Sequence, residues 1–411
     1  MSNASVRIQR ICVVGGGHAA HAMVALLAYK GFQVTMFSGF EDEASRLQQA
    51  VATQNGIEAL FAEHLTPSGR ILGKPSLISN SAAQAVKGCD VVLLPLPSFA
   101  YENVLREISP HLTDGAFVGV TPGQGGFDWV ARKVVGDKVF RRMNWFAILP
   151  MPFNCRIVEY GKRVGVQAYK TDYRVACTPV SHIEQASFIV QQLFGSCKPV
   201  GHFITATLFP LNPNIHPQRL YGLLHNYKEG DVLTGNPLFY EDMDELSIEM
   251  MEKTSAEMQA VSKKLKEAGI EADIPTILEA EQLTWPQGAA KAPNDLKTIF
   301  RTSPNYKGFR CPFARCKERE EPEGREVYIP DLRSRYFTED IPWGLCLYKG
   351  VADIVEVSTP TLDKLILWAQ TLMHKEYVVN NRLVGKHSAE TTAPQTFGIC
   401  TLAQLKSYYF G

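Results

Sequence analysis

A run of three glycines near the start of the chain could hold phosphate groups. The segment consists of Gly15, Gly16, Gly17, His18, Ala19 and Ala20, which matches the pattern G-x-G-x-x-A. In that pattern the glycines permit a tight strand-to-helix turn and a close approach of backbone to a pyrophosphate, and the small last residue lets helix and sheet pack closely. The amide groups at the helix N-terminus then face the phosphates. We predict dinucleotide binding here, the alternative being a purely structural glycine turn.

The end of the next expected strand does not decide between NAD and NADP. An acid there would hydrogen-bond the ribose 2′-hydroxyl and repel a 2′-phosphate, but the strand ends near Ser38 and its acids follow only at residues 41–43. Arg46, which could clamp a 2′-phosphate, lies two helical turns further on. We expect NAD as the cofactor, with Ser38 near its ribose, and not FAD, because the sequence lacks other signals of a large flavin domain.

Two later loops are expected to border the nicotinamide. One strand-like segment ends in Pro95, Leu96 and Pro97, and the next, TPGQGGF, contains Gln124. In doubly wound folds the carboxyl ends of strands line the ligand crevice. We therefore assign Leu96 and Pro97 to the cofactor site, although a rigid turn would explain the prolines equally well.

One histidine in the second half has the surroundings of a general acid or base. In NPNIHP, His216 stands among amide side chains and two prolines, whose rigid backbone would aim the imidazole at a cleft. The run RYFTEDIP adds Arg335 and Asp340; an arginine binds a carboxylate bidentately, and an aspartate fixes the tautomer of a histidine. A structural histidine and a surface charge cluster are the alternatives, and spacing alone does not bring residues 216 and 340 together.

The elements that must position these residues alternate in the first half. Strands are expected within residues 10–15, 32–38, 90–97, 116–123 and 145–152, and helices within 18–31, 41–56, 82–88 and 99–112. Residues 156–179 favour a short antiparallel extension, 237–269 and 359–378 favour long helices, and 314–330 a solvated loop. The pattern predicts the α/β class, with an N-terminal Rossmann-like doubly wound parallel sheet over residues 1–200 and a mainly α-helical C-terminal domain over 201–411.

Composition narrows the function classes. The chain has 411 residues with 42 basic and 42 acidic side chains, so it lacks the excess of positive charge that nucleic-acid binding needs. No run of about 18 apolar residues and no signal peptide is visible, so no membrane span is expected. Nine scattered cysteines suit the reducing cytoplasm, and the one close pair, Cys311 and Cys316, is a poor zinc candidate. We expect a small-molecule partner and no metal.

Taken together, several segments resemble the opine dehydrogenases. They are GGGHAAH, LPLPSFAYE, TPGQGGF, PFNCRI, NPNIHP, PLFYED, SPNYKGF, RYFTEDIPWG, TLDKLILWAQTLMHKEY and APQTFG, and they span essentially the whole chain. This is the NAD/NADP octopine/nopaline dehydrogenase family, with octopine, tauropine, alanopine and strombine dehydrogenases. The resemblance implies that pyruvate and the amino group of an amino acid form an imine, which NADH reduces to a secondary amine as a terminal step of anaerobic glycolysis.

The resemblance also implies roles for particular residues. His216 would be the general acid/base and Asp340 its partner, Arg335 would bind the carboxylate of the keto acid, and Gln124 and Cys155 would line the substrate cleft. Closure of the two domains would exclude water from the imine. A cytoplasmic monomer is expected.

The amine, and two other functions, stay open at this point. A basic amino acid such as arginine would want a carboxylate, for which Glu241, Asp242 and Asp244 are candidates, whereas taurine, glycine or alanine would not. A 2-hydroxy acid or 6-phosphogluconate-like dehydrogenase would use a lysine instead, Lys228 or Lys307. A non-catalytic dinucleotide sensor is the remaining alternative.

Overall fold

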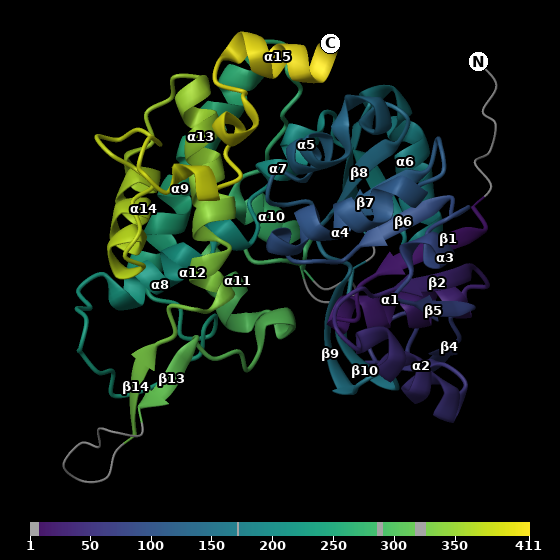
Figure 1. Cartoon of the computed structure of the whole chain (residues 1–411). Helices are drawn as coiled ribbons and strands as arrows, with labels where there is room; N and C mark the ends of the chain where they lie inside the picture. The colour runs from purple at the N-terminus through teal and green to yellow at the C-terminus, as the bar shows by residue number, and fades with distance from the viewer. Residues whose placement is uncertain (1–7, 171, 286–290, 317–325) are drawn as a thin grey trace. The chain divides into compact units, whose positions relative to one another are not determined.

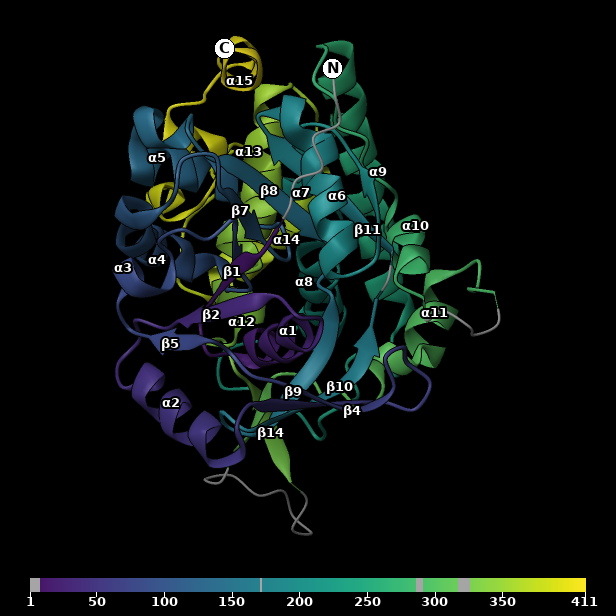
Figure 2. The ribbon, with the colours of Figure 1, turned by 90° about the vertical axis from the view of Figure 1, so that its right-hand side faces the viewer.

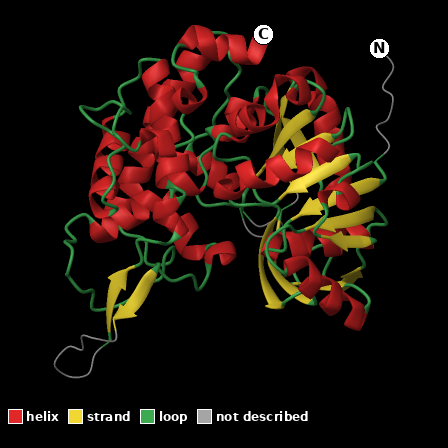
Figure 3. Cartoon of the chain, in the orientation of Figure 1, coloured by secondary structure: helices red, strands yellow, loops and turns green. Residues whose placement is uncertain are grey.

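Two compact units make up the chain. The computed structural model describes residues 8–170, 172–285, 291–316 and 326–411 (Figure 1). The units are Met1–Thr207 and Leu208–Gly411. Most strands belong to the first unit, and the second is built mainly of helices (Figure 3). Within the described ranges, no helix is both long enough and apolar enough to cross a membrane.

An eight-stranded sheet forms the centre of the first unit, in the order β12-β11-β8-β7-β6-β1-β2-β5. Its strands are β1 (Arg10–Val14), β2 (Gln33–Phe37), β5 (Leu77–Ser79), β6 (Val91–Leu94), β7 (Phe117–Val120), β8 (Asn144–Leu149), β11 (Asp172–Thr178) and β12 (Ser196–Pro199). Neighbours from β5 to β8 are parallel, and β11 runs antiparallel to β8. β1, between β2 and β6, marks the point where strand order reverses and ligands bind. The predicted Rossmann-like fold is confirmed.

A second sheet of four strands packs against the first helix. Its order is β4 (Gly69–Gly73), β3 (Ile57–Phe61), β10 (Arg163–Tyr169) and β9 (Phe153–Glu159). The predicted antiparallel extension supplies β9 and β10, but β3 and β4 were not foreseen. Helix α1 (His18–Tyr29) contacts strands of both sheets (Figure 2), and its residues 20–27 are all buried. Burial on all sides explains why this helix is apolar around its whole circumference.

Most of the remaining helices of the first unit connect strands of the large sheet. The remaining helices are α2 (Glu43–Gln54), α3 (Ala82–Ala85), α4 (Tyr101–Ile108), α5 (Phe127–Phe140), α6 (Ile183–Leu193) and α7 (Phe203–Thr207). Of these, α2 leads from β2 into β3, and α7 follows β12. α4 packs on α5, while α6 packs on β11 and β12. The helices expected before residue 112 are therefore present, with shorter bounds.

The second unit is a helical assembly with one small hairpin. It contains α8 (His216–Leu224), α9 (Glu245–Glu267), α10 (Ile277–Leu283), α11 (Leu296–Thr302), α12 (Arg335–Thr338), α13 (Cys346–Ile354), α14 (Pro360–Leu372) and α15 (Leu402–Phe410). α8 and α14 pack on α9, whose Met250, Met251 and Met258 are buried.

The solvated loop expected over residues 314–330 was partly wrong. β13 (Phe313–Cys316) pairs antiparallel with β14 (Val327–Pro330), in a register that joins Phe313 to Pro330. β-branched and aromatic residues in these short runs favour strand pairing, which the dense charges between them obscured. Residues 317–325 lie outside the described residues.

Candidate active site

The glycine turn draws the carboxyl ends of three parallel strands together. Gly15 has a φ of 95°, a conformation that favours glycine, and its N–H donates to the carbonyl of Phe37 at 2.7 Å. A Cβ on Gly15 would lie only 2.8 Å from Cδ2 of Leu96. The end of β1 is thus close to the ends of β2 and β6, and two of the residues assigned to the cofactor, Gly15 and Leu96, lie side by side.

The N-terminus of α1 fits a pyrophosphate. No side chain caps this terminus, and its first turn holds no acidic residue. Apart from Gly17 itself and the neighbouring backbone, no described residue has an atom within 4 Å of the place where a Cβ on Gly17 would stand. Open space in front of unpaired helical N–H groups is the arrangement that binds phosphates.

Two histidines of α1 tie the glycine turn to the second sheet. Nδ1 of His18 accepts a hydrogen bond from the amide of Ile157 at 3.1 Å. Nε2 of His21 accepts from the amide of Gly161 at 2.9 Å, so Nδ1 carries the proton that it donates to the carbonyl of Gly17 at 3.0 Å. Burial lowers the pKa of His21. The neutral imidazole of His21 therefore links the glycine turn to the backbone at Gly161.

The acid that is absent from the end of β2 comes from the next helix. Glu43, the first residue of α2, accepts a hydrogen bond from the hydroxyl of Ser38. Its carboxylate fills the space in which a side chain on Gly16 would stand. Arg46 is already paired with Asp42 at 2.8 Å. A carboxylate therefore lies beside the phosphate turn, where Rossmann folds read the ribose hydroxyls.

The two remaining residues expected to line the substrate cleft have different surroundings. Nε2 of Gln124 is buried and has no hydrogen-bond partner among the described residues, so a ligand oxygen could accept from it. Cys155 lies on β9 in the hydrophobic core of the first unit and is 4% exposed. Burial raises the pKa of its thiol to about 12, which keeps the thiol neutral. Pro97 precedes a 3₁₀ turn, Ser98–Ala100.

In the second unit, His216 and Asp340 meet although they are 124 positions apart in the sequence. Nδ1 of His216 lies 2.8 Å from Oδ2 of Asp340, and both side chains are buried. His216 begins α8, with Pro217 at a position where its missing N–H costs no hydrogen bond. Asp340 precedes a π-helical turn, Ile341–Leu345, in which the amide of Leu345 donates to the carbonyl of Asp340 at 2.9 Å. Such turns are frequent at functional sites.

A close backbone approach explains how the two segments come together. A 3₁₀ turn, Asn212–Asn214, leads into α8, and its Pro213 packs on Gly344 of the π-helical turn. A Cβ on Gly344 would lie 2.5 Å from the ring of Pro213, so this contact requires glycine. The proline that stiffens the histidine segment therefore also sets its distance from the aspartate.

The charged groups around the pair of His216 and Asp340 differ in their exposure to solvent. Burial raises the pKa of Asp340, and the neighbouring His216 works against that rise. The Arg335 side chain is 60% exposed, and its Nε lies 2.5 Å from Oε2 of Glu339. The amide of Asp340 donates to the carbonyl of Arg335 at 3.1 Å, so the same turn carries both residues. An exposed guanidinium thus stands one turn from the buried carboxylate, where it can meet an anionic substrate.

The imidazole also has partners that the sequence did not reveal. Nε2 of His216 lies 3.1 Å from the hydroxyl of Tyr240. The ring of Tyr336 lies 4.1 Å from the imidazole between centroids, and Phe239 meets it edge-on at 5.3 Å. These tyrosines come from PLFYED and RYFTED, segments that we singled out for their acids and arginine and not for their aromatic rings.

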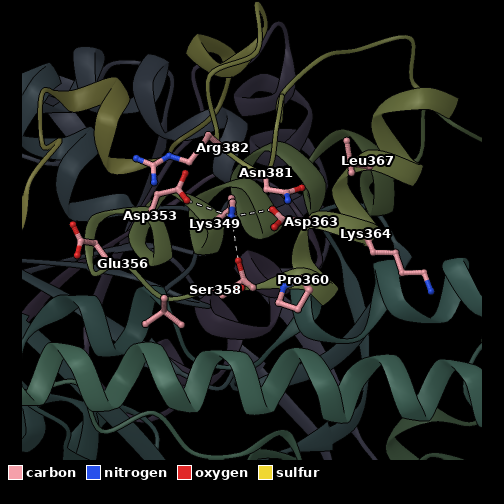
Figure 4. Close-up of a pocket in the computed structure, with 12 residues that line it drawn as sticks. Lys349, Asp353, Glu356, Ser358, Pro360, Asp363, Lys364, Leu367, Asn381 and Arg382 are labelled. Carbon is pink, nitrogen blue, oxygen red and sulfur yellow. Dashed lines mark hydrogen bonds and ion pairs between the residues drawn. The ribbon is translucent and has the colours of Figure 1, made fainter.

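A separate polar pocket of about 580 Å³ opens in the second unit (Figure 4). It is lined by Lys349, Asp353, Glu356, Val357, Ser358, Thr359, Pro360, Asp363, Lys364, Leu367, Asn381 and Arg382. Nζ of the buried Lys349 lies 2.9 Å from Asp363, 3.3 Å from Asp353 and 3.3 Å from the hydroxyl of Thr359. Two ion pairs and one hydrogen bond therefore surround this ammonium group, and Lys349 links α13 to α14. The pocket includes none of the predicted site residues.

Comparison with known proteins decides the family. A sequence model described as NAD/NADP octopine/nopaline dehydrogenase, alpha-helical domain, matches residues 199–373. Another, described as NADP oxidoreductase coenzyme F420-dependent, matches residues 10–123. The chain is 30% identical over 400 residues to octopine dehydrogenase of Pecten maximus, covering 96% of this chain and 97% of that protein. The chain belongs to the octopine/nopaline dehydrogenase family.

Other members are similarly close over their whole length. Tauropine dehydrogenase of Arabella iricolor is 29% identical over 404 residues, which cover 95% of this chain and 98% of that protein. Solved structures of octopine dehydrogenase with NADH and L-arginine, and with NADH and pyruvate, each align with a TM-score of 0.81 and 29% identity; the alignments cover 97% of this chain and 97% and 98% of those chains. The resemblance to opine dehydrogenases is thereby confirmed, and the chain is an NAD(P)-dependent oxidoreductase of this family.

Proposed function

We propose that this member of the family condenses pyruvate with the amino group of an amino acid and reduces the product with NADH to a secondary amine. The observation that carries the proposal is the buried pair of His216 and Asp340, one turn from the exposed guanidinium of Arg335. A general acid/base and a carboxylate-binding cation are what an imine-forming reaction on a keto acid needs. A solved structure of the related octopine dehydrogenase with NADH and pyruvate supports the choice of cofactor and keto acid, and its complex with L-arginine supports an amino acid as the second substrate class.

Each residue would have a defined task. Pyruvate, an amino acid, NADH and one proton give the secondary amine, NAD and water. His216 would take a proton from the substrate ammonium group and return one to the oxygen that leaves as water, while Asp340 keeps the proton on Nδ1. Arg335 would bind the carboxylate of pyruvate, and Gln124 would donate its unpaired amide hydrogen to a ligand oxygen. NADH, when bound, supplies the hydride.

Glu43 supports NADH as the preferred cofactor. A carboxylate that is held by Ser38 beside Gly16 can accept hydrogen bonds from ribose hydroxyls and repels a 2′-phosphate. The nearest arginine on the same helix, Arg46, is engaged by Asp42. A 2′-phosphate would therefore be repelled by Glu43 and would find no unpaired arginine on α2.

The acids considered for a basic amine have structural tasks instead. Glu241 accepts from the amide of Gly308 at 2.7 Å, and Asp242 accepts from the amide of Leu238 at 2.7 Å. Asp244 caps α9 and pairs with the fully buried Arg219. We therefore favour an amino acid without a side-chain cation, such as taurine, glycine, alanine or β-alanine.

Amine dependence tests the proposal. NADH oxidation is followed with pyruvate and each of taurine, glycine, alanine, β-alanine and arginine, beside a control without amine. We expect oxidation only with a particular amine. An equal rate without amine would instead assign a 2-hydroxy acid dehydrogenase, and NADH binding with no turnover would assign a sensor. The monomeric state and the cytoplasmic location stay predictions.

A further inference from the structure

We propose that the hydroxyl of Tyr240 relays protons between His216 and the reacting substrate. This inference rests on the proposed function and adds a third residue to its proton-transfer chain. Nδ1 of His216 is engaged by Asp340 at 2.8 Å and Nε2 by Tyr240 at 3.1 Å, so both ring nitrogens have protein partners. An imidazole nitrogen makes one hydrogen bond in its plane. A proton that leaves Nε2 therefore passes to the phenolic oxygen.

The tyrosine ring is fixed on several sides. It stacks on Tyr306 at 4.3 Å between centroids with an interplanar angle of 19°, and on Phe300 at 5.8 Å. A ring held in this way keeps its hydroxyl in reach of the imidazole without losing rotational freedom at each turnover.

The helix that carries the histidine also fixes the backbone before the tyrosine. Arg219, one turn after His216 on α8, is fully buried. Its Nε donates to the carbonyl of Phe239 at 2.8 Å, and a second nitrogen donates to the carbonyl of Leu238 at 3.2 Å. Helix α8 therefore carries His216 and, through Arg219, also holds the backbone next to Tyr240, which fixes the spacing between the two side chains.

The transfer balances without any further reactant. When His216 is neutral, Nδ1 donates to Asp340 and the Tyr240 hydroxyl donates to Nε2. When the ring is protonated, Nε2–H donates to the phenolic oxygen. As the proton on Nε2 moves to that oxygen, the phenolic proton moves to the oxygen that leaves the substrate as water, and the tyrosine ends as the same neutral phenol.

The test compares Tyr240→Phe with Tyr306→Phe. Both changes keep the stacked rings, but only the first removes a hydroxyl from the histidine. With the amine that supports turnover, Tyr240→Phe is expected to lower kcat by about 10- to 1000-fold, to leave the dissociation constant of NADH unchanged, and to reduce the solvent deuterium isotope effect on kcat. The pH–rate profile should also change, because both protonation states of the imidazole lose a hydrogen-bond partner. Tyr306→Phe should stay within about threefold in kcat with an unchanged profile, since it leaves the histidine's partners in place.

A second measurement does not depend on turnover. Nitrogen-15 spectra of histidine-labelled protein, assigned with His216→Ala, should show the Nε2 signal of His216 changed by Tyr240→Phe and not by Tyr306→Phe. An unchanged Nε2 signal, or a kcat for Tyr240→Phe within twofold of the unaltered enzyme, would overturn the relay. The unaltered protein could instead show no amine-dependent turnover while Tyr240→Phe clearly changes the spectrum. That result would refute both the proposed function and the relay, although the contact between Tyr240 and His216 would be confirmed.

Discussion

Replacement of Asp340 by asparagine removes one charge and almost nothing else. Asparagine has the same shape, and its carbonyl oxygen can accept the proton of Nδ1 over the 2.8 Å that now separates His216 from the carboxylate. Both side chains are buried, at 5% and 6% exposure, so little solvent compensates for the lost charge. The variant therefore isolates the electrostatic contribution of the carboxylate to a protonated imidazole.

The size of the effect follows from the kind of hydrogen bond that is changed. A hydrogen bond to a charged group contributes about 1.5–3 kcal/mol and a neutral one about 0.5–1.5 kcal/mol. The variant should stabilise the imidazolium by about 1–2 kcal/mol less, which corresponds to a kcat about 5- to 30-fold lower. Burial raises the pKa of Asp340, so the fold disfavours the ionised carboxyl. Its replacement by an amide should therefore not lower the free energy of unfolding at neutral pH.

Steady-state NADH oxidation and thermal unfolding measure the two halves of this prediction. We expect a reduced kcat, an unchanged dissociation constant for NADH, and a melting temperature at or above that of the unaltered protein. A kcat within twofold of the original would show that the carboxylate does not assist the histidine. A large fall in melting temperature would show that the pair is mainly a structural ion pair.

Three further predictions concern the cofactor, the pH and the second unit. Glu43→Gln should raise the ratio of kcat/KM for NADPH to that for NADH by about 10- to 100-fold, since it removes the charge that repels a 2′-phosphate, whereas Glu41→Gln should not; steady-state kinetics with both cofactors decide. Burial lowers the pKa of His21 from 6.5, so the stability it contributes is complete above pH 6.5 and is lost as the pH falls through the lowered pKa; thermal unfolding across this range should show the loss, and His21→Gln should flatten it. Lys349→Met should cost about 3–5 kcal/mol in chemical denaturation because it leaves the buried carboxylate of Asp363 without its cation, and the exposed Lys364→Met should cost less than about 1 kcal/mol.

The sequence predicted those parts of the site that lie within one local segment. The glycine turn leads directly into α1. The parallel strands end close to the proline and glycine residues that marked their ends in the sequence. β3 and β4 were missed because residues 57–73 include glycine, proline and charged residues without a clear period of two. β3 pairs with β10, about a hundred residues later, which no local pattern records, and β4 joins the sheet only through β3.

The other parts of the site depend on contacts that form only when the chain folds. Glu43 was discounted because it follows Ser38 by five positions, but the start of α2 returns its carboxylate to the glycine turn. The meeting of His216 with Asp340 depends on Pro213 packing against Gly344, and Tyr240 joins them through a loop that Arg219 holds. The residue types indicated the chemistry of His216 and Asp340, but only the tertiary structure shows that the two side chains are within hydrogen-bonding distance.

The most direct test of the proposed reaction follows the hydride into the product. The protein is incubated with pyruvate, the amine panel and NADH that carries deuterium at C4, and the products are identified by mass spectrometry and NMR. We expect a secondary amine built from pyruvate and one amino acid, with a single deuterium on the carbon that was the keto carbon of pyruvate. Deuterated lactate as the product, whether or not an amine is present, would contradict it.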